Sequence, residues 1–296
     1  MRRIRCGTNP GAVSKAITWV IVALGLGWLT WPIWGSLTAP DRETVAAETP
    51  ALLFALAGLV VLLAWGVWHD CGYHAPALAP VTLLVVVDSA VRLLLSPGSS
   101  GVEPTFALPL LAGATLGGPA GFLTGALAAM TSSIPLGLVQ PPLVGQTLVW
   151  GLWGLAGGGL RSLRTRTACF VGILACLPLG IVSGLLLNLI GWTGETAATT
   201  GAFLPGLPPL ASATRLWEYT WATSFAYDAS RAITNAALLL LVGLPLLHGM
   251  RAAWGVAPGP TDQPARNPRV SSAARERRAR SSTLNQLWNL DEGGTE

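Results

Sequence analysis

The stretch that most constrains the fold runs from Glu103 to Arg161. The 57 residues between these two charged residues contain no Asp, Glu, Lys or Arg. A soluble domain of this size would place charges at its surface far more often, whereas a hydrocarbon bilayer disfavours them. At a rise of about 1.5 Å per residue, the stretch is long enough for two or three helical membrane crossings. The chain is therefore predicted to be an all-α integral membrane protein.

Small residues recur at helical spacing inside this stretch. The series is Gly113, Gly117, Gly121, Gly125 and Ala129, followed later by Gly154 and Gly158. In lipid, small residues four positions apart let helix backbones approach closely. The alternative is that glycine is simply commoner in membrane helices than in soluble ones. Under either interpretation, the stretch forms the packed centre of the protein.

The composition of the whole chain agrees with a membrane protein. Charged residues make up 11% and the mean hydropathy is +0.54, whereas a soluble chain carries about 25% charged residues. The net charge of +4 does not indicate nucleic-acid binding, because the positive residues lie in loops and tail. The cysteines show no CxxC pair and no histidine cluster, so neither a metal site nor a disulfide framework is predicted and they are interpreted as packing residues. They are Cys6, Cys71, Cys169 and Cys176.

Hydropathy predicts about eight transmembrane helices. The spans are about 13–36, 50–68, 75–95, 104–117, 119–138, 142–160, 168–192 and 223–249. The fourth is short, so it either tilts across the membrane or dips in and returns. The long connection 193–222 either lies along the surface or caps a pocket.

Lysine and arginine are distributed unevenly between the two sides. With eight crossings and the N-terminus inside, 14 of the 18 Lys and Arg residues fall in inner segments and two fall in outer loops. The remaining two, Arg92 and Arg231, lie within spans. Because cytoplasmic segments carry the excess of positive residues, both termini are predicted to be cytoplasmic, in a multi-pass protein of the cell (plasma) membrane.

Charged residues inside the predicted spans point to either packing or function. Asp88 and Arg92 are four residues apart, and Asp228 and Arg231 three apart, so each pair shares a helix face and can neutralise itself. One interpretation is two ion pairs that lock helices together. The other is a polar lining around a solute, which other intramembrane polar residues would extend: Glu103, Gln146, Asn188 and Asn235.

Depth favours a pocket near the outer face. Under the predicted topology, most of these polar residues and several aromatic ones fall in the outer half of the membrane, as suits a pocket for an organic solute. For the tryptophans, an interfacial aromatic belt is the alternative. The candidate substrate-binding residues are Asp88, Arg92, Glu103, Gln146, Asn188, Trp192, Trp221, Tyr227, Asp228, Arg231 and Asn235.

Motifs that the chain lacks limit its activity. It contains no GxxxxGK[ST], so it is not its own P-loop ATPase, and no HExxH, GxSxG or Cys/His constellation. No catalytic residue and no bound cofactor are predicted, and the chain is not expected to be an enzyme.

Several segments, taken together and in order, are typical of one known family. They are WPIW at 31–34, ETPALLFAL at 48–56, DSAVRLL at 88–94, GVEPTFALPLLAGATLGGPAGFLTGALAAMTSS at 101–133, QPPLVGQTLVWGLWGLAGGGL at 140–160, GLLLNLIGW at 184–192 and YTWATSFAYDASRAITNAALLLLVGLPLL at 219–247. With these segments the chain resembles the substrate-binding S component of energy-coupling factor (ECF) vitamin transporters, in a longer form with two extra N-terminal helices.

The resemblance implies a domain organisation and a set of partners. Residues 1–12 would be a cytoplasmic N-terminus, 13–74 two extra helices, 75–250 a six-helix substrate-binding core, and 251–296 a disordered basic cytoplasmic tail. The core would capture a vitamin or related micronutrient, with cobalamin or a corrinoid as a lead. It would deliver the solute through a membrane coupling subunit driven by two cytoplasmic ATPase subunits, which use the ATP.

The family also implies a docking surface for the coupling subunit. Its first core helix carries an Ala-x-x-x-Ala surface, to which the spacing of Ala75 and Ala79 is similar, although prolines interrupt it. The small-residue face formed by Gly121, Gly125 and Ala129 is a second candidate.

Three hypotheses follow for function. The first is the binding subunit of an ATP-driven importer. The second is a stand-alone secondary transporter that uses Asp88 or Asp228 as a proton relay. The third is a structural or assembly membrane protein in which the charge pairs serve packing alone.

Overall fold

The structure is a computed structural model that describes residues 11–34, 42–95, 102–138, 142–193 and 200–254, without the side chains of 42–47, 75 and 76. The chain divides into two units, Met1–Ala257 and Pro258–Glu296. The second unit lies entirely outside the described residues, as do most of the predicted tail and all but two residues of the predicted N-terminal segment. The described residues contain helices and connections but no strand.

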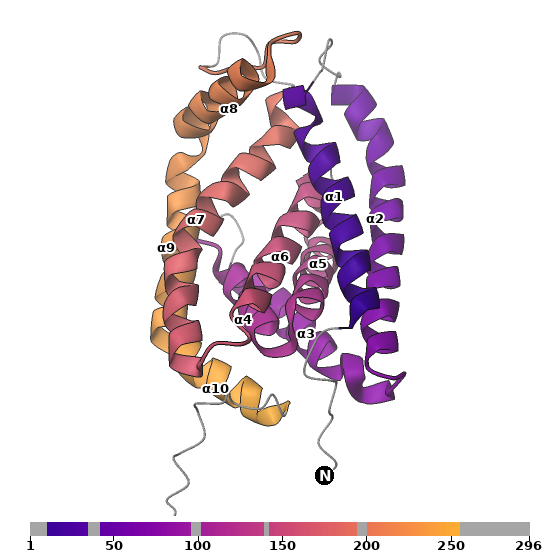
Figure 1. Ribbon diagram of the computed structural model, residues 1–296. Coiled ribbons are helices and arrows are strands. Elements are labelled where there is room, and N and C mark those ends of the chain that lie inside the picture. The colour runs from indigo at the N-terminus through magenta and orange to yellow at the C-terminus, as the bar shows by residue number, and fades with distance from the viewer. Residues whose placement is uncertain (1–10, 35–41, 96–101, 139–141, 194–199, 255–296) are drawn as a thin grey trace, which may run out of the picture. The chain divides into compact units, whose positions relative to one another are not determined.

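The two N-terminal helices are confirmed. α1 (Ala12–Trp34) and α2 (Arg42–Asp70) pack side by side, and α2 also packs against α5 (Figure 1). At one end of this pair, Asp70 accepts a hydrogen bond of 2.8 Å from the backbone N–H of Ser14. This contact places an acidic side chain at the N-terminus of α1, where the helix dipole favours it.

The cysteines do not all serve packing. Cys71, directly after α2, is disulfide-bonded, so the interpretation as a packing residue is wrong there. Cys169 and Cys176 are free and buried. Cys6 lies outside the described residues.

α3 (Ala79–Leu95) turns one charged face inward. Its buried residues are Pro80, Val81, Leu84, Val85, Asp88 and Arg92, which recur every three or four positions as on one side of a helix. Leu83, Val86 and Val87 are exposed on the other side. Ala75 belongs to a short 3₁₀ helix, η1 (Ala75–Leu78), and Ala79 begins α3, so the two alanines do not share one α-helical face.

α4 and α5 form a tight helical hairpin. η2 (Pro104–Phe106) leads into α4 (Ala107–Leu116), and α5 (Gly118–Ser133) follows after one residue, Gly117. Gly117 has φ 106°, a conformation that only glycine adopts readily. The 10 residues of α4 rise about 15 Å, roughly half of the hydrocarbon thickness. The predicted span at 104–117 is therefore short for a full membrane crossing, as its length in the sequence indicated.

The periodic glycines pack helix backbones against one another. A Cβ atom on Gly154 of α6 (Pro142–Gly159) would overlap the carbonyl group of Gly121 on α5, and one on Gly125 would overlap the backbone of Trp150. Gly113 of α4 meets α6 in the same way. Close backbone approach is therefore the reason for the spacing.

This packing corrects one proposed docking surface. Gly121 and Gly125 are buried against α6, and Ala129 is 0% exposed. The face that they form is occupied within the chain, so it cannot also receive a coupling subunit in this conformation.

The C-terminal half brings three helices together. α7 (Thr165–Trp192) packs on α9 (Phe225–Leu238) where Gly180 lies against Ala232 (Figure 1). The connection 193–222 contains a helix of its own, α8 (Pro209–Thr223). Ser224 separates it from α9 and has non-helical dihedral angles.

α9 continues through a π-helical turn, η3 (Leu239–Gly243), into α10 (Leu244–Ala253). Pro245 has no backbone N–H and its ring would clash in a regular α-helix, so one wider turn accommodates it. The thiol of Cys169 lies 3.6 Å from the carbonyl oxygen of Leu239 within this turn.

Four of the described helical segments are long and apolar enough to cross a membrane. They are Ala12–Trp34, Glu48–Asp70, Thr165–Trp192 and Phe225–Ala253. The four α-helices that follow the second of these segments in the chain are shorter. α3, α4, α5 and α6 have 17, 10, 16 and 18 residues, respectively. An all-helical membrane protein is supported, whereas the prediction of eight full crossings is not established.

Arg251, in the last turn of α10, connects the ends of two other helices. Its buried guanidinium donates to the carbonyl oxygens of Ala114 (3.1 Å), Leu160 (3.2 Å) and Leu163 (2.9 Å), at the ends of α4 and α6. Carbonyl groups at a helix C-terminus have no partner within the helix and attract a cation. In the sequence, Arg251 counts only as one of the inner positive charges.

Replacing Arg251 by Ala is expected to lower the free energy of unfolding by about 3 kcal/mol, because it removes the donor to several buried carbonyl groups. Arg251→Lys should recover only part of this loss, since an ammonium group lacks the planar fork. The unfolding midpoint in detergent checks both variants. The control, exposed Arg166→Ala, should stay within about 0.5 kcal/mol of the parent. Equal midpoints for Arg251→Ala and Arg166→Ala would contradict this role.

Candidate solute-binding site

Arg231 of α9 is the centre of a buried charge cluster. Its Nε–H donates to Oε2 of Glu103 at 2.8 Å, and a terminal nitrogen donates to Oδ1 of Asp228 at 2.7 Å. The Arg231 and Asp228 side chains are 8% and 4% exposed, and that of Glu103 is 30% exposed. The predicted pair between Asp228 and Arg231 is confirmed. Glu103 joins it from a position 128 residues away in the chain.

Asp228 extends the cluster to α7 and α8. Its second oxygen, Oδ2, accepts a hydrogen bond from Ser224 Oγ at 2.8 Å. Asn188 of α7 donates in turn to Ser224 Oγ at 2.7 Å and to Thr220 Oγ1 at 3.0 Å. Gly184 leaves the space that the Asp228 carboxylate fills. The junction between α8 and α9 is thereby held against α7.

Asn235 fixes the segment that carries Glu103. Its Oδ1 accepts from the backbone N–H of Ala107 at 2.8 Å, and its Nδ2 donates to the Glu103 carbonyl oxygen at 2.7 Å and to that of Arg231 at 2.8 Å. Asn235 is 0% exposed. The side-chain amide of Asn235 therefore provides hydrogen-bond partners for backbone groups at both ends of η2, as buried backbone groups require.

Asn235→Ala is expected to cost about 2 kcal/mol of stability, because it leaves the Ala107 N–H and the Glu103 carbonyl without their partner. Asn235→Asp should be no better, since a carboxylate cannot donate to the Glu103 carbonyl. Hydrogen exchange of residues 104–107, together with the unfolding midpoint, measures the effect. Thr234→Ala serves as the control, because Thr234 bonds only within its own helix. Unchanged exchange at 104–107 in both Asn235 variants would refute this function of the amide.

Arg92 forms the second part of the network. One terminal nitrogen donates to Ser132 Oγ at 2.9 Å and to Ser133 Oγ at 2.8 Å, and the other donates to Gln146 Oε1 at 3.1 Å. The nitrogen that bonds the two serines, Nη1, also lies 3.4 Å from the carbonyl oxygen of Ala129. Of these partners, only Gln146 was predicted as a site residue. For Ser132 and Ser133, the signal in the sequence is that two consecutive serines end a helix without charged residues.

The predicted pair between Asp88 and Arg92 is wrong. Among the described residues, neither forms an ion pair with the other, and both carboxylate oxygens of Asp88 are buried without a hydrogen-bond partner. Arg92 instead turns to the C-terminal turn of α5, where hydroxyl and carbonyl oxygens attract a cation. A shared helix face made the pair possible, but tertiary acceptors decided the geometry.

Aromatic rings join the two parts. The Phe106 ring centre lies 5.5 Å from the Arg231 guanidinium and 5.2 Å from the Trp150 ring. Trp150 in turn lies 5.0 Å from the Arg92 guanidinium. Cations over aromatic faces are stabilised, more so when desolvated. Phe106 and Trp150 were not among the predicted site residues.

Three predicted aromatic site residues lie outside the network. Trp192 is buried and donates to the Gly201 carbonyl oxygen at 2.8 Å, so it holds the connection 193–222 in place. Trp221 is 57% exposed and Tyr227 is 47% exposed. Trp221 stacks on Phe225 at 4.0 Å on the outer surface. This placement favours the aromatic-belt interpretation for Trp221 and Tyr227.

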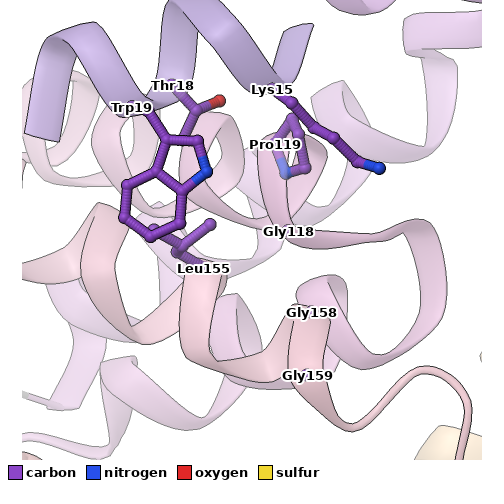
Figure 2. A pocket seen from close by; sticks show the side chains of 8 residues that line it. All are labelled: Lys15, Thr18, Trp19, Gly118, Pro119, Leu155, Gly158 and Gly159. Atoms are coloured by element: carbon purple, nitrogen blue, oxygen red, sulfur yellow. The ribbon is translucent and has the colours of Figure 1, made fainter. Parts of the chain in front are cut away.

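An open cleft lies apart from the network. It measures about 220 Å³ and lies between α1, the start of α5 and the end of α6 (Figure 2). Its lining residues are Lys15, Thr18, Trp19, Gly118, Pro119, Leu155, Gly158 and Gly159. None of them was predicted as a substrate-binding residue. The described residues contain no group of His, Cys, Asp and Glu that could hold a metal ion.

Eight of the predicted site residues thus form a polar group on α3, α6, α7, α9 and the segment before η2: Asp88, Arg92, Glu103, Gln146, Asn188, Asp228, Arg231 and Asn235. Among the described residues, Asp88 has no hydrogen-bond partner for its carboxylate. No protein-family model, curated protein or solved structure matches the chain.

Proposed function

We propose that this chain is the solute-binding membrane subunit of an ATP-driven importer of the ECF type, which captures a vitamin or related micronutrient from outside the cell. One observation carries the proposal. Two buried arginines, two carboxylates and three amides from distant parts of the chain converge in one network inside an apolar helical protein. Intramembrane charges are costly, and they concentrate at solute and ion sites.

The partially open edge of this network supports binding rather than packing alone. Glu103, at 30% exposure, is the one carboxylate of the described cluster that solvent reaches appreciably, and it contacts the guanidinium group of Arg231. A solute entering at Glu103 would meet charged, amide and aromatic groups together, as is usual in pockets for organic molecules.

The proposed complex supplies what the chain lacks. A membrane coupling subunit and two cytoplasmic ATPase subunits would bind and hydrolyse the ATP, because this chain has no P-loop motif. In the proposed orientation, both termini are cytoplasmic and the network lies toward the outer face of a six-helix core. Cobalamin or a corrinoid is the first solute to try.

Native mass spectrometry of the detergent-purified chain tests the proposal, with cells grown on a vitamin mixture. We expect one small-molecule adduct with the mass of a vitamin, retained in Arg166→Gln and lost in Arg92→Gln when both variants elute as folded monomers. A spectrum without adduct across the mixture, with affinities no better than millimolar, would refute it. That result would favour a structural membrane protein whose charges serve packing.

Asp88 favours a second candidate, a stand-alone secondary transporter. Its carboxyl group is 0% exposed and has no hydrogen-bond partner among the described residues, as a group that exchanges a proton during transport would be. The purified chain alone, in liposomes, should then take up solute along an imposed proton gradient, and Asp88→Asn should abolish uptake. Uptake that requires partner subunits and ATP excludes this candidate.

A further inference from the structure

The two buried arginines of the network differ in the charges around them. Arg231 pairs with two carboxylates, at 2.7 and 2.8 Å. Arg92 is 6% exposed, yet every acceptor of its guanidinium among the described residues is a neutral oxygen. Glu103 and Asp88 both attract Arg92 electrostatically, but among the described residues neither lies within ion-pair distance of it. Since a buried cation without a carboxylate in contact is costly, this side of the network would gain from one more negative group.

Glu103 is the less firmly held of the two carboxylates on Arg231. Asp228 lies on α9, is almost fully buried and has a second hydrogen bond from Ser224. Glu103 lies in the non-helical segment just before η2, with φ −120° and ψ 89°, and no second hydrogen bond of its carboxylate is found among the described residues. Its side chain can leave Arg231 by rotation, without the displacement of a helix.

We propose that the Glu103 carboxylate marks an anion-binding subsite. A carboxylate or phosphate group of the solute replaces it on the Nε side of Arg231, so the substrate is an organic anion. This inference rests on the proposed function and names the substrate class of the same site.

The charges explain why an anion is preferred. Exchange of one anion for another leaves Arg231 neutralised throughout, because Asp228 stays in place. The incoming group also keeps the attraction to Arg92 that Glu103 now provides. A cationic group could not take the place of Glu103 on Arg231, because two like charges would then be brought together.

Small carboxylates test the subsite directly. Glu103→Ala empties the position of the carboxylate while Arg231 keeps Asp228 as its partner. For a dissociation constant of about 10 mM, sodium acetate at about 100 mM should raise the unfolding midpoint of this variant by about 3 °C over sodium chloride at the same ionic strength. Glu103→Ser provides the same cavity if the alanine variant does not fold.

Three matched proteins should show no acetate-specific rise. In the parent protein, Glu103 occupies the subsite; in Glu103→Gln, a neutral amide of the same size fills it; and in Glu218→Ala, a glutamate is removed from the exposed surface of α8. A folded Glu103→Ala or Glu103→Ser protein with equal midpoints in acetate and chloride would overturn the proposal.

A charge series in the Glu103→Ala variant tests the preference for an anion. Benzoate, benzamide and benzylamine share one ring and differ in charge. We expect benzoate to raise the midpoint most and benzylamine least, and Arg92→Gln to remove the difference. Equal midpoints with the three compounds would count against the inference.

The outcomes separate this inference from the proposed function. A vitamin adduct without any anionic group would overturn the inference and leave the importer proposal intact. An acetate response in Glu103→Ala, without any vitamin adduct or uptake, would support the anion subsite and refute the importer.

Discussion

Gly154→Ala is expected to separate α5 from α6 and to lower the free energy of unfolding by about 4 kcal/mol. The added methyl group would overlap the carbonyl group of Gly121 and the backbone nitrogen of Phe122. Backbone atoms cannot rotate away as a side chain does, so a whole helix must shift. The shift would also disturb the contact of Gly113 with Gly154 and thereby α4.

Unfolding midpoints in detergent measure this effect, with Gly27→Ala and Gly58→Ala as controls. These glycines lie in α1 and α2, and a Cβ atom there would meet nothing within 4 Å. Because alanine favours a helix over glycine by about 1 kcal/mol, both controls should be neutral or slightly stabilised. A Gly154→Ala protein as stable as these controls would disprove backbone packing as the function of the periodic glycines.

Arg231→Gln is expected to lower stability by about 4 kcal/mol, because it leaves the buried Asp228 carboxylate and that of Glu103 without their cation. Asp228→Asn should cost less, since Arg231 keeps Glu103, and Glu103→Gln should cost least, since Arg231 keeps the better buried Asp228. The three single variants therefore form a ranked series.

A double-mutant cycle measures the coupling behind this ranking. Asp228→Asn combined with Arg231→Gln removes one charge of each sign, so the double variant should be more stable than the sum of the single losses by at least about 1 kcal/mol. Additive losses would show that these charges do not stabilise each other. The same cycle, measured in the Glu103→Gln background, shows how much of the coupling between Asp228 and Arg231 depends on Glu103.

Local spacing predicted contacts within a helix, but it could not identify partners from other helices. Asp228 and Arg231 are three residues apart and pair as predicted. Asp88 and Arg92 are four apart and do not, because α5 presents Ser132 and Ser133 to Arg92. A shared face makes two groups neighbours, and the tertiary acceptors then compete for each of them.

Long-range partners had no signal of their own in the sequence. Glu103 and Arg231 are 128 positions apart, and Arg251 reaches Ala114 over 137. In the sequence, Glu103, Arg231 and Arg251 appear only as charged residues that need a partner. For Trp221 the sequence left a pocket and an aromatic belt open, and its 57% exposure favours the belt.

The glycine contacts among α4, α5 and α6 also limit which parts of the protein can move. Where these helices meet backbone to backbone, no side chain lies between them that could adopt another rotamer, so we expect the three elements to move as one unit. At Ser224, α8 and α9 are also held by side-chain hydrogen bonds, those of Asn188 on α7 and of Asp228 on α9, in addition to the packing of Ala232 on Gly180. Under the proposed function, α4, α5 and α6 would therefore form the fixed frame of any movement that accompanies solute exchange.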